Sequence, residues 1–369
     1  MDKHSCRLSI GIDASRATTP RPTGIEIYSQ RLIQSLLALD SPHHFRLYFR
    51  DAPPSDTFPK AELRLIPLPR LWTHLRLSWE MIRQPPDVLF VPAHVLPPVH
   101  PRASLVTVHD LGYLHFPQAH PWPQRLYLDL STRWNAHAAA HILADSEATK
   151  ADLIARYAIS PDKVTVAYPG YDETLDPVHD RARIEAVKDR YDIASDYFLY
   201  LGTLQPRKNL PRLLRAFAAL KPKSVLVLAG KRGWLCDDLF AQVDRLNLEG
   251  RVIFPGYIPE GDKAALLGGA LAFVFPSLYE GFGLPVLEAQ ACGCPVITSD
   301  SSSLPEVAGD AAILVDPQDI AALTAAMERV AADLMLQKSL IERGYANVRR
   351  FSWTTCAQIT LSVIEQFMV

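Results

Sequence analysis

The segment Phe275-Pro-Ser-Leu-Tyr-Glu-Gly-Phe-Gly-Leu-Pro-Val-Leu-Glu-Ala-Gln-Ala-Cys-Gly-Cys-Pro-Val-Ile297 contains the pattern that decides the fold. An apolar run ends at Pro276, and a loop with Gly281 and Gly283 follows it. Pro285 stands where a helix would begin, a position at which its missing N–H costs nothing. A second apolar run closes the segment. This order of buried strand, glycine loop, helix and buried strand is typical of a parallel α/β sheet.

The same alternation continues along almost the whole chain. In the first half, strands are expected at Leu8–Ala14, Phe45–Phe49, Leu63–Pro67, Val88–Val91, Leu105–His109, His141–Ala144 and Val164–Ala167, and helices at Ile25–Leu39, Leu71–Arg83, Pro123–Ala140 and Ser146–Tyr157. In the second half, strands are expected at Tyr197–Gly202, Val225–Gly230, Val252–Phe254, Ala272–Pro276, Val296–Ser299 and Ile313–Val315, with helices from about Ile320 onward. The pattern pauses after Tyr168, and we expect the domain boundary near residues 170–195. The sequence therefore predicts an α/β protein with two Rossmann-like, doubly wound domains facing a central cleft.

The composition limits the class of protein. The chain has 369 residues, enough for two α/β domains, and a net charge of −2, which does not favour nucleic acid as a partner. Its five cysteines are scattered, and Cys292 and Cys294 lack zinc-site spacing, so we expect reduced thiols and no metal. No signal-peptide h-region or apolar run of membrane-spanning length is evident. The expected location is cytoplasmic, with peripheral contact at the inner face of a membrane left open.

The glycine loop of the quoted segment is predicted to bind a diphosphate. Glycine lets the backbone approach a ligand closely, and a helix N-terminus presents free N–H groups to an anion. Glu280 lies on this loop, and Glu288 is placed in the first turn of the following helix, where both could accept hydrogen bonds from sugar or ribose hydroxyls. The alternative for Glu288 is a charge that only complements the helix dipole.

A second strand end carries two adjacent cations. The run Gly202-Thr-Leu-Gln-Pro-Arg-Lys-Asn209 follows an apolar strand, and Asn209 is expected to cap the next helix. Arg207 and Lys208 could neutralise a leaving diphosphate, although an Arg-Lys pair is commonly solvated surface.

The first half offers two more candidates. Gly24 opens the first helix after a strand, but a full Gly-x-Gly-x-x-Gly is missing, which argues against dinucleotide binding there. His109 and Asp110 end another strand at the expected cleft. The histidine is interpreted either as a ligand contact or as a structural residue.

With these motifs, the sequence resembles the group 1 glycosyltransferases, family 4 of the retaining enzymes, over nearly its whole length. The resemblance implies a GT-B fold with an acceptor-binding domain at 1–180, a nucleotide-sugar-binding domain at 181–350 and a last helix at 351–369 that crosses back to the first domain. It implies that the donor is bound by Gly24, Gly202, Thr203, Arg207, Lys208, Tyr257, Ile258, Glu280, Gly281, Phe282, Gly283, Leu284 and Glu288.

By similarity, Arg207 and Lys208 would contact the diphosphate, with Gly24 presenting N–H groups to it. Glu280 would bind the transferred sugar and Glu288 the ribose, and the N–H groups of residues 282–284 would hold sugar or phosphate. His109 would contact the donor sugar near its reacting carbon, and Tyr257-Ile258 would border the nucleobase. The residues expected to act in catalysis are His109, Glu280, Arg207 and Lys208.

The chain contains no Asp-x-Asp motif, so fixed cations and N–H dipoles are expected to stabilise the departing charge without a metal. The resemblance implies retention of configuration, and no carboxylate stands out as a nucleophile. We therefore expect a front-face displacement, in which the leaving phosphate accepts the acceptor's proton.

The donor and the acceptor are less defined. The resemblance favours GDP-mannose over UDP-glucose as the donor substrate, without any further cofactor, and a saccharide or lipid-linked acceptor. The segment Arg70–Arg83 mixes aromatic residues, leucines and arginines, and could lie on anionic lipid or simply pack on the first sheet. The alternative functions are a sugar-nucleotide epimerase, a phosphorylase-like enzyme and a non-catalytic sugar-nucleotide-binding protein.

Overall fold

The structure, a computed structural model, describes residues 7–19, 24–93, 95–119, 121–221, 223–233 and 237–368. The chain divides into two compact units, the first formed by Met1–Gly170 with Phe351–Val369 and the second by Tyr171–Arg350. The division falls at Gly170, earlier than the boundary at residue 180 drawn from the sequence. The last segment of the chain belongs to the first unit.

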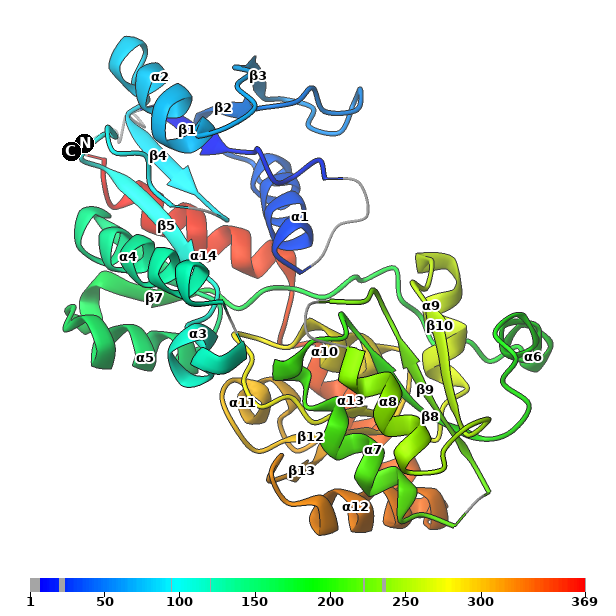
Figure 1. Cartoon of the computed structure of the whole chain (residues 1–369). Coiled ribbons are helices and arrows are strands. Elements are labelled where there is room, and N and C mark those ends of the chain that lie inside the picture. Colours follow the sequence, from blue (N-terminus) through cyan, green and yellow to red (C-terminus); the bar gives the residue numbers. More distant parts are fainter. Residues whose placement is uncertain are drawn as a thin grey trace. The chain divides into compact units, whose positions relative to one another are not determined.

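Each unit is built on a parallel sheet, which confirms the predicted α/β class with two doubly wound sheets (Figure 1). In the described part of the first unit, seven strands follow the order β3-β2-β1-β4-β5-β6-β7; in the second, six follow the order β10-β9-β8-β11-β12-β13. The strands of the first unit are β1 Ser9–Asp13, β2 His44–Phe49, β3 Glu62–Leu65, β4 Val88–Val91, β5 Ser104–Val108, β6 His141–Ala144 and β7 Val164–Val166. Those of the second unit are β8 Tyr197–Leu201, β9 Val225–Ala229, β10 Val252–Gly256, β11 Ala272–Phe275, β12 Val296–Ser299 and β13 Ala312–Val315.

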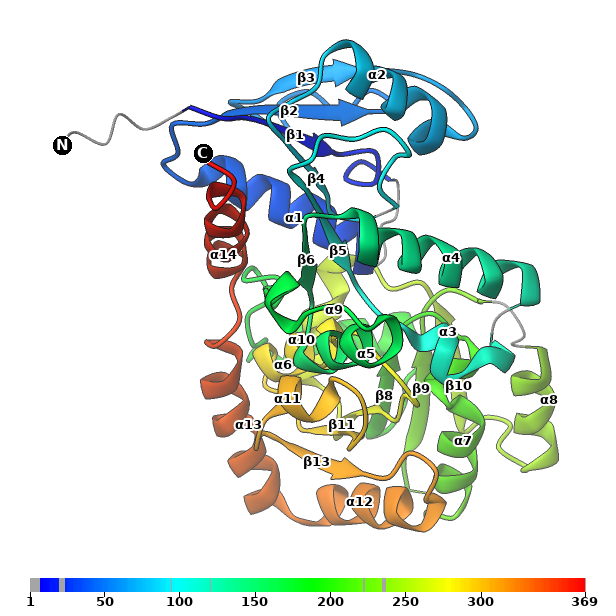
Figure 2. The same ribbon diagram turned by 90° about the vertical axis from the view of Figure 1, so that its left-hand side faces the viewer.

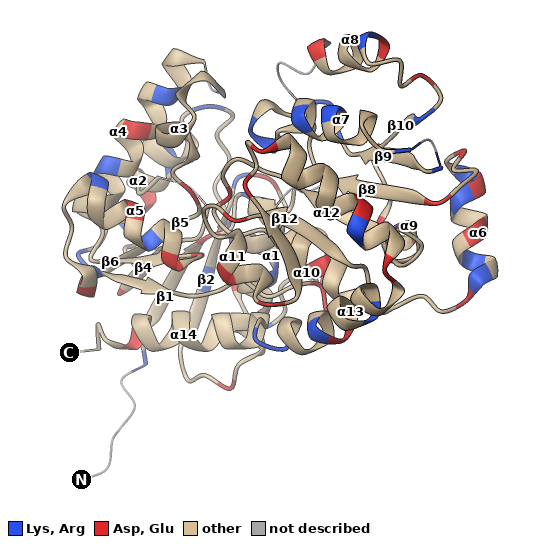
Figure 3. Ribbon diagram, turned by 90° about the horizontal axis from the view of Figure 1, so that it is seen from below, with Lys and Arg blue, Asp and Glu red and all other residues tan. Residues whose placement is uncertain are grey.

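Helices connect these strands. Those of the first unit are α1 Gly24–Ala38, η1 Trp72–Leu77, α2 Ser78–Arg83, α3 Gly112–His115, η2 Pro117–Ala119, α4 Trp122–Ala138, α5 Glu147–Tyr157, η3 Pro161–Lys163 and α14 Trp353–Glu365. Those of the second unit are α6 Arg181–Arg190, η4 Pro206–Lys208, α7 Leu210–Ala218, α8 Asp237–Arg245, α9 Glu260–Gly268, α10 Leu284–Ala291, α11 Leu304–Ala308, α12 Ile320–Ala332 and α13 Leu334–Val348. Helix α6 carries charges of both signs (Figure 3). No helix among the described residues is long and apolar enough to cross a bilayer.

The segment expected as one helix at Leu71–Arg83 is helical from Trp72 to Arg83, as predicted, but its winding changes along its length. Residues Trp72–Leu77 form a π-helical turn, and α2 begins only at Ser78. Trp72 is buried, and its indole N–H donates to the Ile66 carbonyl oxygen at 2.7 Å, which fixes the start of the segment against the end of β3.

The two faces of the first sheet bury separate cores. Because side chains alternate along a strand, Ile10 and Phe90 pack towards α1 and α14, whereas Leu89 and Val106 pack towards α2, α4 and α5. Figure 2 shows α1 and α14 together on one side of these strands. Helix α14 buries Trp353 and Ile364 in the core that it shares with α1.

The carboxyl ends of β8 and β9 approach so closely that only glycine fits. A Cβ atom at Gly230 would lie 1.9 Å from the carbonyl oxygen of Gly202, and the φ angle of Gly230 is +140°. We expect Gly230→Ala to lower the free energy of unfolding by about 3 kcal/mol, because both the clash and the strained backbone oppose the alanine. Urea unfolding measures the loss. Gly261→Ala, on helix α9 with no atom within 4 Å of the added Cβ, is the control and should be neutral or slightly stabilising. Equal stability of Gly230→Ala and the wild type would contradict the close approach.

Candidate active site

The glycine loop of the second unit lies between β11 and α10, as predicted. Strand β11 ends at Phe275, and α10 begins at Leu284 after Gly283, whose φ angle is +123°. Ser303 Oγ donates to the carbonyl oxygens of Glu280 at 2.9 Å and Phe282 at 2.6 Å. The N–H of Glu280 donates to Ser302 Oγ at 2.9 Å. The loop is therefore pinned by a serine-rich segment that follows β12.

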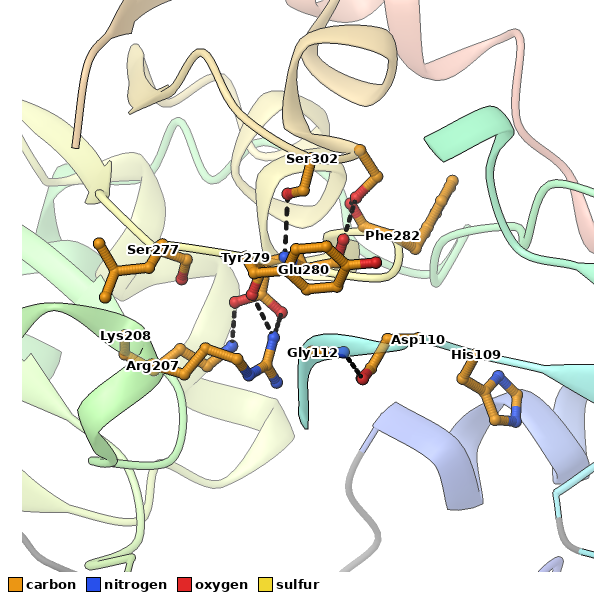
Figure 4. Close-up of polar contacts among 12 residues, drawn as sticks. His109, Asp110, Gly112, Arg207, Lys208, Ser277, Tyr279, Glu280, Phe282 and Ser302 are labelled. Carbon is orange, nitrogen blue, oxygen red and sulfur yellow. Dashed lines mark hydrogen bonds and ion pairs between the residues drawn. The ribbon is translucent and has the colours of Figure 1, made fainter. Parts of the chain in front are cut away.

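Arg207 and Lys208 both contact the carboxylate of Glu280 (Figure 4). Arg207 Nη1 donates to Oε2 at 2.8 Å, and it also donates to the Tyr279 carbonyl oxygen. Lys208 Nζ lies 2.5 Å from Oε1 and 4.7 Å from the centroid of the Phe275 ring. The three charged side chains are largely buried. The structure thus brings together three of the four residues that were expected to act in catalysis.

The two cations determine the charge state of Glu280. Burial alone would raise the pKa of this carboxyl, but the nearby charges of Arg207 and Lys208 outweigh burial and lower the pKa to about 2. Glu280 is therefore ionised at neutral pH and can act only as a hydrogen-bond acceptor.

Asn209 has a different role from the predicted one. It occupies the N-cap position of α7, but its φ angle is +61° and its side chain makes no capping hydrogen bond. Instead, its Nδ2 donates to the carbonyl oxygens of Pro276 at 3.1 Å and Pro317 at 2.6 Å. The amide therefore joins the loops that follow β11 and β13 to the loop carrying the two cations.

The prediction that Glu288 lies in the first turn of its helix was wrong. Glu288 is the fifth residue of α10, whose first turn contains no acidic residue. Its Oε1 accepts from Lys263 Nζ at 3.2 Å, and Lys263 also pairs with Glu260 at 2.8 Å. Burial raises the pKa of Glu288, and the Lys263 charge opposes this shift. Glu288 thus forms an ion pair with Lys263 of α9 and does not act as a charge at the N-terminus of its own helix.

The remaining donor-binding candidates of the second unit lie at strand ends. Gly202 and Thr203 follow β8, and the Thr203 carbonyl oxygen accepts from the Tyr200 hydroxyl at 3.1 Å. Tyr257 is exposed and Ile258 is buried, directly after β10. Lys231 Nζ lies 5.4 Å from the centroid of the Tyr257 ring, so a cation adjoins the aromatic surface proposed for the nucleobase.

In the first unit, Gly24 is the exposed first residue of α1, and residues 20–23, which precede it, lie outside the described ones. His109 follows β5, and both of its ring nitrogens have protein partners. Nδ1 lies 2.6 Å from Asp145 Oδ2, and Nε2 lies 2.9 Å from the Pro92 carbonyl oxygen. Asp110 accepts from the N–H of Gly112 at 2.9 Å. A ring contact between His109 and a sugar, as expected from the sequence, would require one of the two partners to be exchanged.

The surroundings of His109 favour the imidazolium. A carbonyl oxygen only accepts, so Nε2 carries a proton, and an ionised Asp145 requires a second proton on Nδ1. Burial lowers the pKa of His109, but the charge and hydrogen bond of Asp145, together with the charge of Asp110 and the Pro92 carbonyl, outweigh burial and raise the pKa above its ordinary value. Burial also raises the pKa of Asp145, against the opposing effect of His109.

We expect Asp145→Asn to lower the pKa of His109, because the charge that stabilises the imidazolium is removed. NMR titration of the histidine ring nitrogens measures this shift. The control variant His137→Gln, at an exposed position of α4, should remove the signal of His137 and leave the titration of His109 unchanged. The pKa of His109 is higher in the folded than in the unfolded protein, so its protonation stabilises the fold. This contribution is complete below the unfolded-state pKa and is lost as the pH rises through the folded-state pKa. In Asp145→Asn, the free energy of unfolding should therefore not fall in this way as the pH rises. An unchanged His109 titration in this variant would contradict the pairing.

Sequence reasoning missed Asp145, Lys263 and the serines that hold the Glu280 loop. Asp145 stands 36 positions from His109, and Lys263 stands 25 positions from Glu288, on other elements. The run Ser299-Asp-Ser-Ser-Ser303 directly after a predicted strand was a usable signal, since hydroxyls at a strand end commonly bond to neighbouring loops.

Two doubly wound units, one with a buried carboxylate between two cations beside a glycine loop, are the features of an α/β protein of the GT-B type. Residues 185–347 match the family Glycosyl transferases group 1, and residues 22–175 match Glycosyltransferase Family 4. The chain is 31% identical to O-antigen chain mannosyltransferase B of Escherichia coli, over 93% of this chain and 96% of that protein. The chain belongs to the group 1 glycosyltransferases, family 4, and is a glycosyltransferase.

Solved structures confirm the fold. Sucrose-phosphate synthase from Thermosynechococcus elongatus superposes with a TM-score of 0.78 at 23% identity, covering 98% of this chain and 99% of that one. HepE from Anabaena in complex with UDP-glucose gives a TM-score of 0.76 at 17% identity, covering 97% of this chain and 99% of that one.

Proposed function

We propose that this glycosyltransferase transfers a hexose, with mannose favoured, from a nucleoside diphosphate sugar to a saccharide or glycolipid acceptor in cell-surface polysaccharide assembly. We further propose that the reaction retains the anomeric configuration and needs no metal. The observation that carries the proposal is the buried Glu280 carboxylate held by Arg207 and Lys208 at the carboxyl edge of the second sheet. This edge is where open α/β sheets bind their ligands.

In this mechanism the two cations stabilise the charge that develops as the donor diphosphate departs. They are fixed before the reaction by Glu280 and by the Tyr279 carbonyl, so little reorganisation is needed in the transition state. Glu280, ionised and limited to accepting hydrogen bonds, orients the hydroxyls of the transferred sugar.

The proposed transfer reaction needs no nucleophile from the enzyme, because the acceptor oxygen attacks the anomeric carbon directly. The bond from the anomeric carbon to the diphosphate oxygen breaks, and a bond from the same carbon to the acceptor oxygen forms on the same face. The acceptor proton passes to the departing phosphate oxygen, which carries the charge released by the bond cleavage.

The relatives support the choice of donor. A relative that is similar to this chain over nearly its full length is named as an O-antigen chain mannosyltransferase. The structure of HepE, a protein of the same fold, was solved with UDP-glucose. We therefore propose GDP-mannose as the first donor to test and UDP-glucose as the second, with Tyr257 and Ile258 bordering the base. Peripheral contact with the inner face of a membrane is part of the proposal, because it would bring the enzyme to a lipid-linked acceptor.

A thermal-shift screen against GDP-mannose, UDP-glucose, UDP-N-acetylglucosamine, GDP and UDP tests the donor. A ligand that binds only the folded state raises the melting temperature by mass action. We expect GDP-mannose to give the largest shift, unchanged by a chelator. A shift that disappears with the chelator would refute metal independence, and a larger shift with UDP-glucose would reassign the donor.

A further inference from the structure

Helix α4 of the first unit exposes a stripe of large apolar side chains. Trp122, Leu126, Leu130 and Trp134 follow one another at four-residue spacing, and all four are exposed, with Trp122 at 71%. Residues at this spacing lie on one face of a helix. The opposite face packs on the protein through buried Ala136 and its neighbours. Single exposed apolar residues are ordinary, but an aligned set of this kind indicates an interaction surface.

A second apolar stripe lies on the neighbouring segment η1–α2. Leu71, Leu75, Trp79 and Ile82 are each more than half exposed. Both segments pack into the same core on one side of the first sheet. The loop after β4 joins them and adds exposed Val99, so we name the whole surface the α2–α4 face.

Three hydrogen bonds fix this loop between the two segments. The N–H of Val99 donates to Ser78 Oγ at 3.4 Å, and the N–H of Leu96 donates to Asn135 Oδ1 at 3.0 Å. The indole N–H of Trp134 donates to the Leu96 carbonyl oxygen at 3.1 Å.

The charges on the α2–α4 face are biased towards one sign. Arg70 and Arg83 flank the first stripe, Arg125 and Arg133 lie on α4, and all four are exposed. The carboxylates of these helices are engaged by the protein. Glu80 is buried and pairs with Arg64 at 2.9 Å and Arg76 at 3.2 Å. Asp129 accepts from the Tyr157 hydroxyl at 3.0 Å. Figure 3 shows basic positions along α4 in blue.

We propose that the α2–α4 face docks onto a bilayer surface containing anionic lipid. Tryptophan favours the boundary between headgroups and acyl chains, because its ring is amphipathic, and Trp79, Trp122 and Trp134 all lie on this face. Arginines beside the stripe add electrostatic attraction to anionic headgroups. Interfacial helices with leucine and tryptophan on one side and arginine beside them bind membranes in this way.

The proposal rests on the proposed function for its purpose, since docking would present the enzyme to a lipid-linked acceptor. It goes beyond the Arg70–Arg83 segment considered from the sequence. The α4 stripe supplies half of the surface, and its exposure was visible only in the structure.

Sedimentation with vesicles of phosphatidylcholine alone, or of phosphatidylcholine mixed with phosphatidylglycerol, tests the proposal on the full chain. We expect binding to the mixed vesicles that weakens with salt. The triple variant Trp122→Ser, Leu126→Ser, Leu130→Ser should reduce the bound fraction about tenfold or more. The double variant Arg125→Glu, Arg133→Glu should reduce it by about tenfold on the mixed vesicles.

Matched controls come from the second unit. Leu334→Ser with Met335→Ser removes apolar side chains of similar or greater exposure, and Lys221→Glu with Lys338→Glu reverses two exposed charges. Both control variants should bind vesicles like the wild type. All variants should keep the wild-type melting temperature, because the substituted side chains are exposed.

The outcomes separate this proposal from the proposed function. The triple variant should keep transfer to a water-soluble saccharide, and Lys208→Ala should keep vesicle binding. Wild-type protein that does not sediment with the mixed vesicles, or a triple variant that binds like the wild type, would overturn the docking surface and leave the donor site standing. Self-association in sedimentation velocity that the triple variant abolishes, without vesicle binding, would also overturn it and assign the face to a second copy of the chain.

Discussion

Lys208→Ala is expected to lower kcat for sugar transfer by about 10²- to 10³-fold, the usual loss when one preorganised charge partner of a transition state is removed. Lys208 is buried beside Arg207, and both contact the same carboxylate. Alanine removes the ammonium that we assign to the departing diphosphate. Steady-state kinetics with the donor found in the screen measures the change.

The fold should tolerate this substitution. Glu280 keeps its bond to Arg207 at 2.8 Å, so the carboxylate is not left without a partner. Lys338→Ala, at an exposed lysine of α13, is the control and should leave kcat unchanged. Lys208→Arg should restore only part of the activity, because the compact ammonium sits over the Phe275 ring at 4.7 Å and a planar guanidinium does not reproduce that position. Normal transfer by Lys208→Ala would refute the assignment of this cluster as the donor site.

Much of the fold could be predicted because the physics that forms it is local. Continuous apolar runs such as Val88–Val91 can be buried only in a sheet covered on both faces, and this strand has the predicted bounds. The glycine loop could be located for the same reason, since Gly283 adopts a positive φ angle at the start of a helix.

The parts that could not be predicted depend on tertiary contacts. The direction of a long side chain is set by its neighbours, so the sequence did not show that Glu288 faces Lys263 or that His109 faces Asp145. The π-helical turn at Trp72 likewise begins beside a tertiary contact, the hydrogen bond that Trp72 donates to the Ile66 carbonyl oxygen of the preceding loop. The exposure of the apolar side chains of α4 could not be predicted either, because their spacing is equally typical of a helix whose apolar face packs into the core.

Glu280→Gln is expected to reduce the free energy of unfolding by about 3 kcal/mol at neutral pH. The carboxylate is buried, and the pKa falls from its ordinary value of 4.5 to about 2 because Arg207 and Lys208 favour the charged form. Glutamine fills nearly the same volume but leaves the two cations without their anion. The loss therefore reports the electrostatic part of the cluster rather than its packing.

The sign of the pH dependence distinguishes this cause from a simple packing defect. A carboxyl with a lowered folded-state pKa contributes stability that is present above the unfolded pKa, about 4.5, and is lost as the pH falls towards about 2. Urea unfolding at neutral pH should thus separate wild type and Glu280→Gln by the full difference, and unfolding near pH 3 by roughly half of it or less. Glu342→Gln, at an exposed glutamate of α13, should match the wild type at both pH values. A difference between wild type and Glu280→Gln that stays constant with pH would show that Glu280 is not held ionised by the two cations. The charge arrangement on which the transfer mechanism depends would then be wrong.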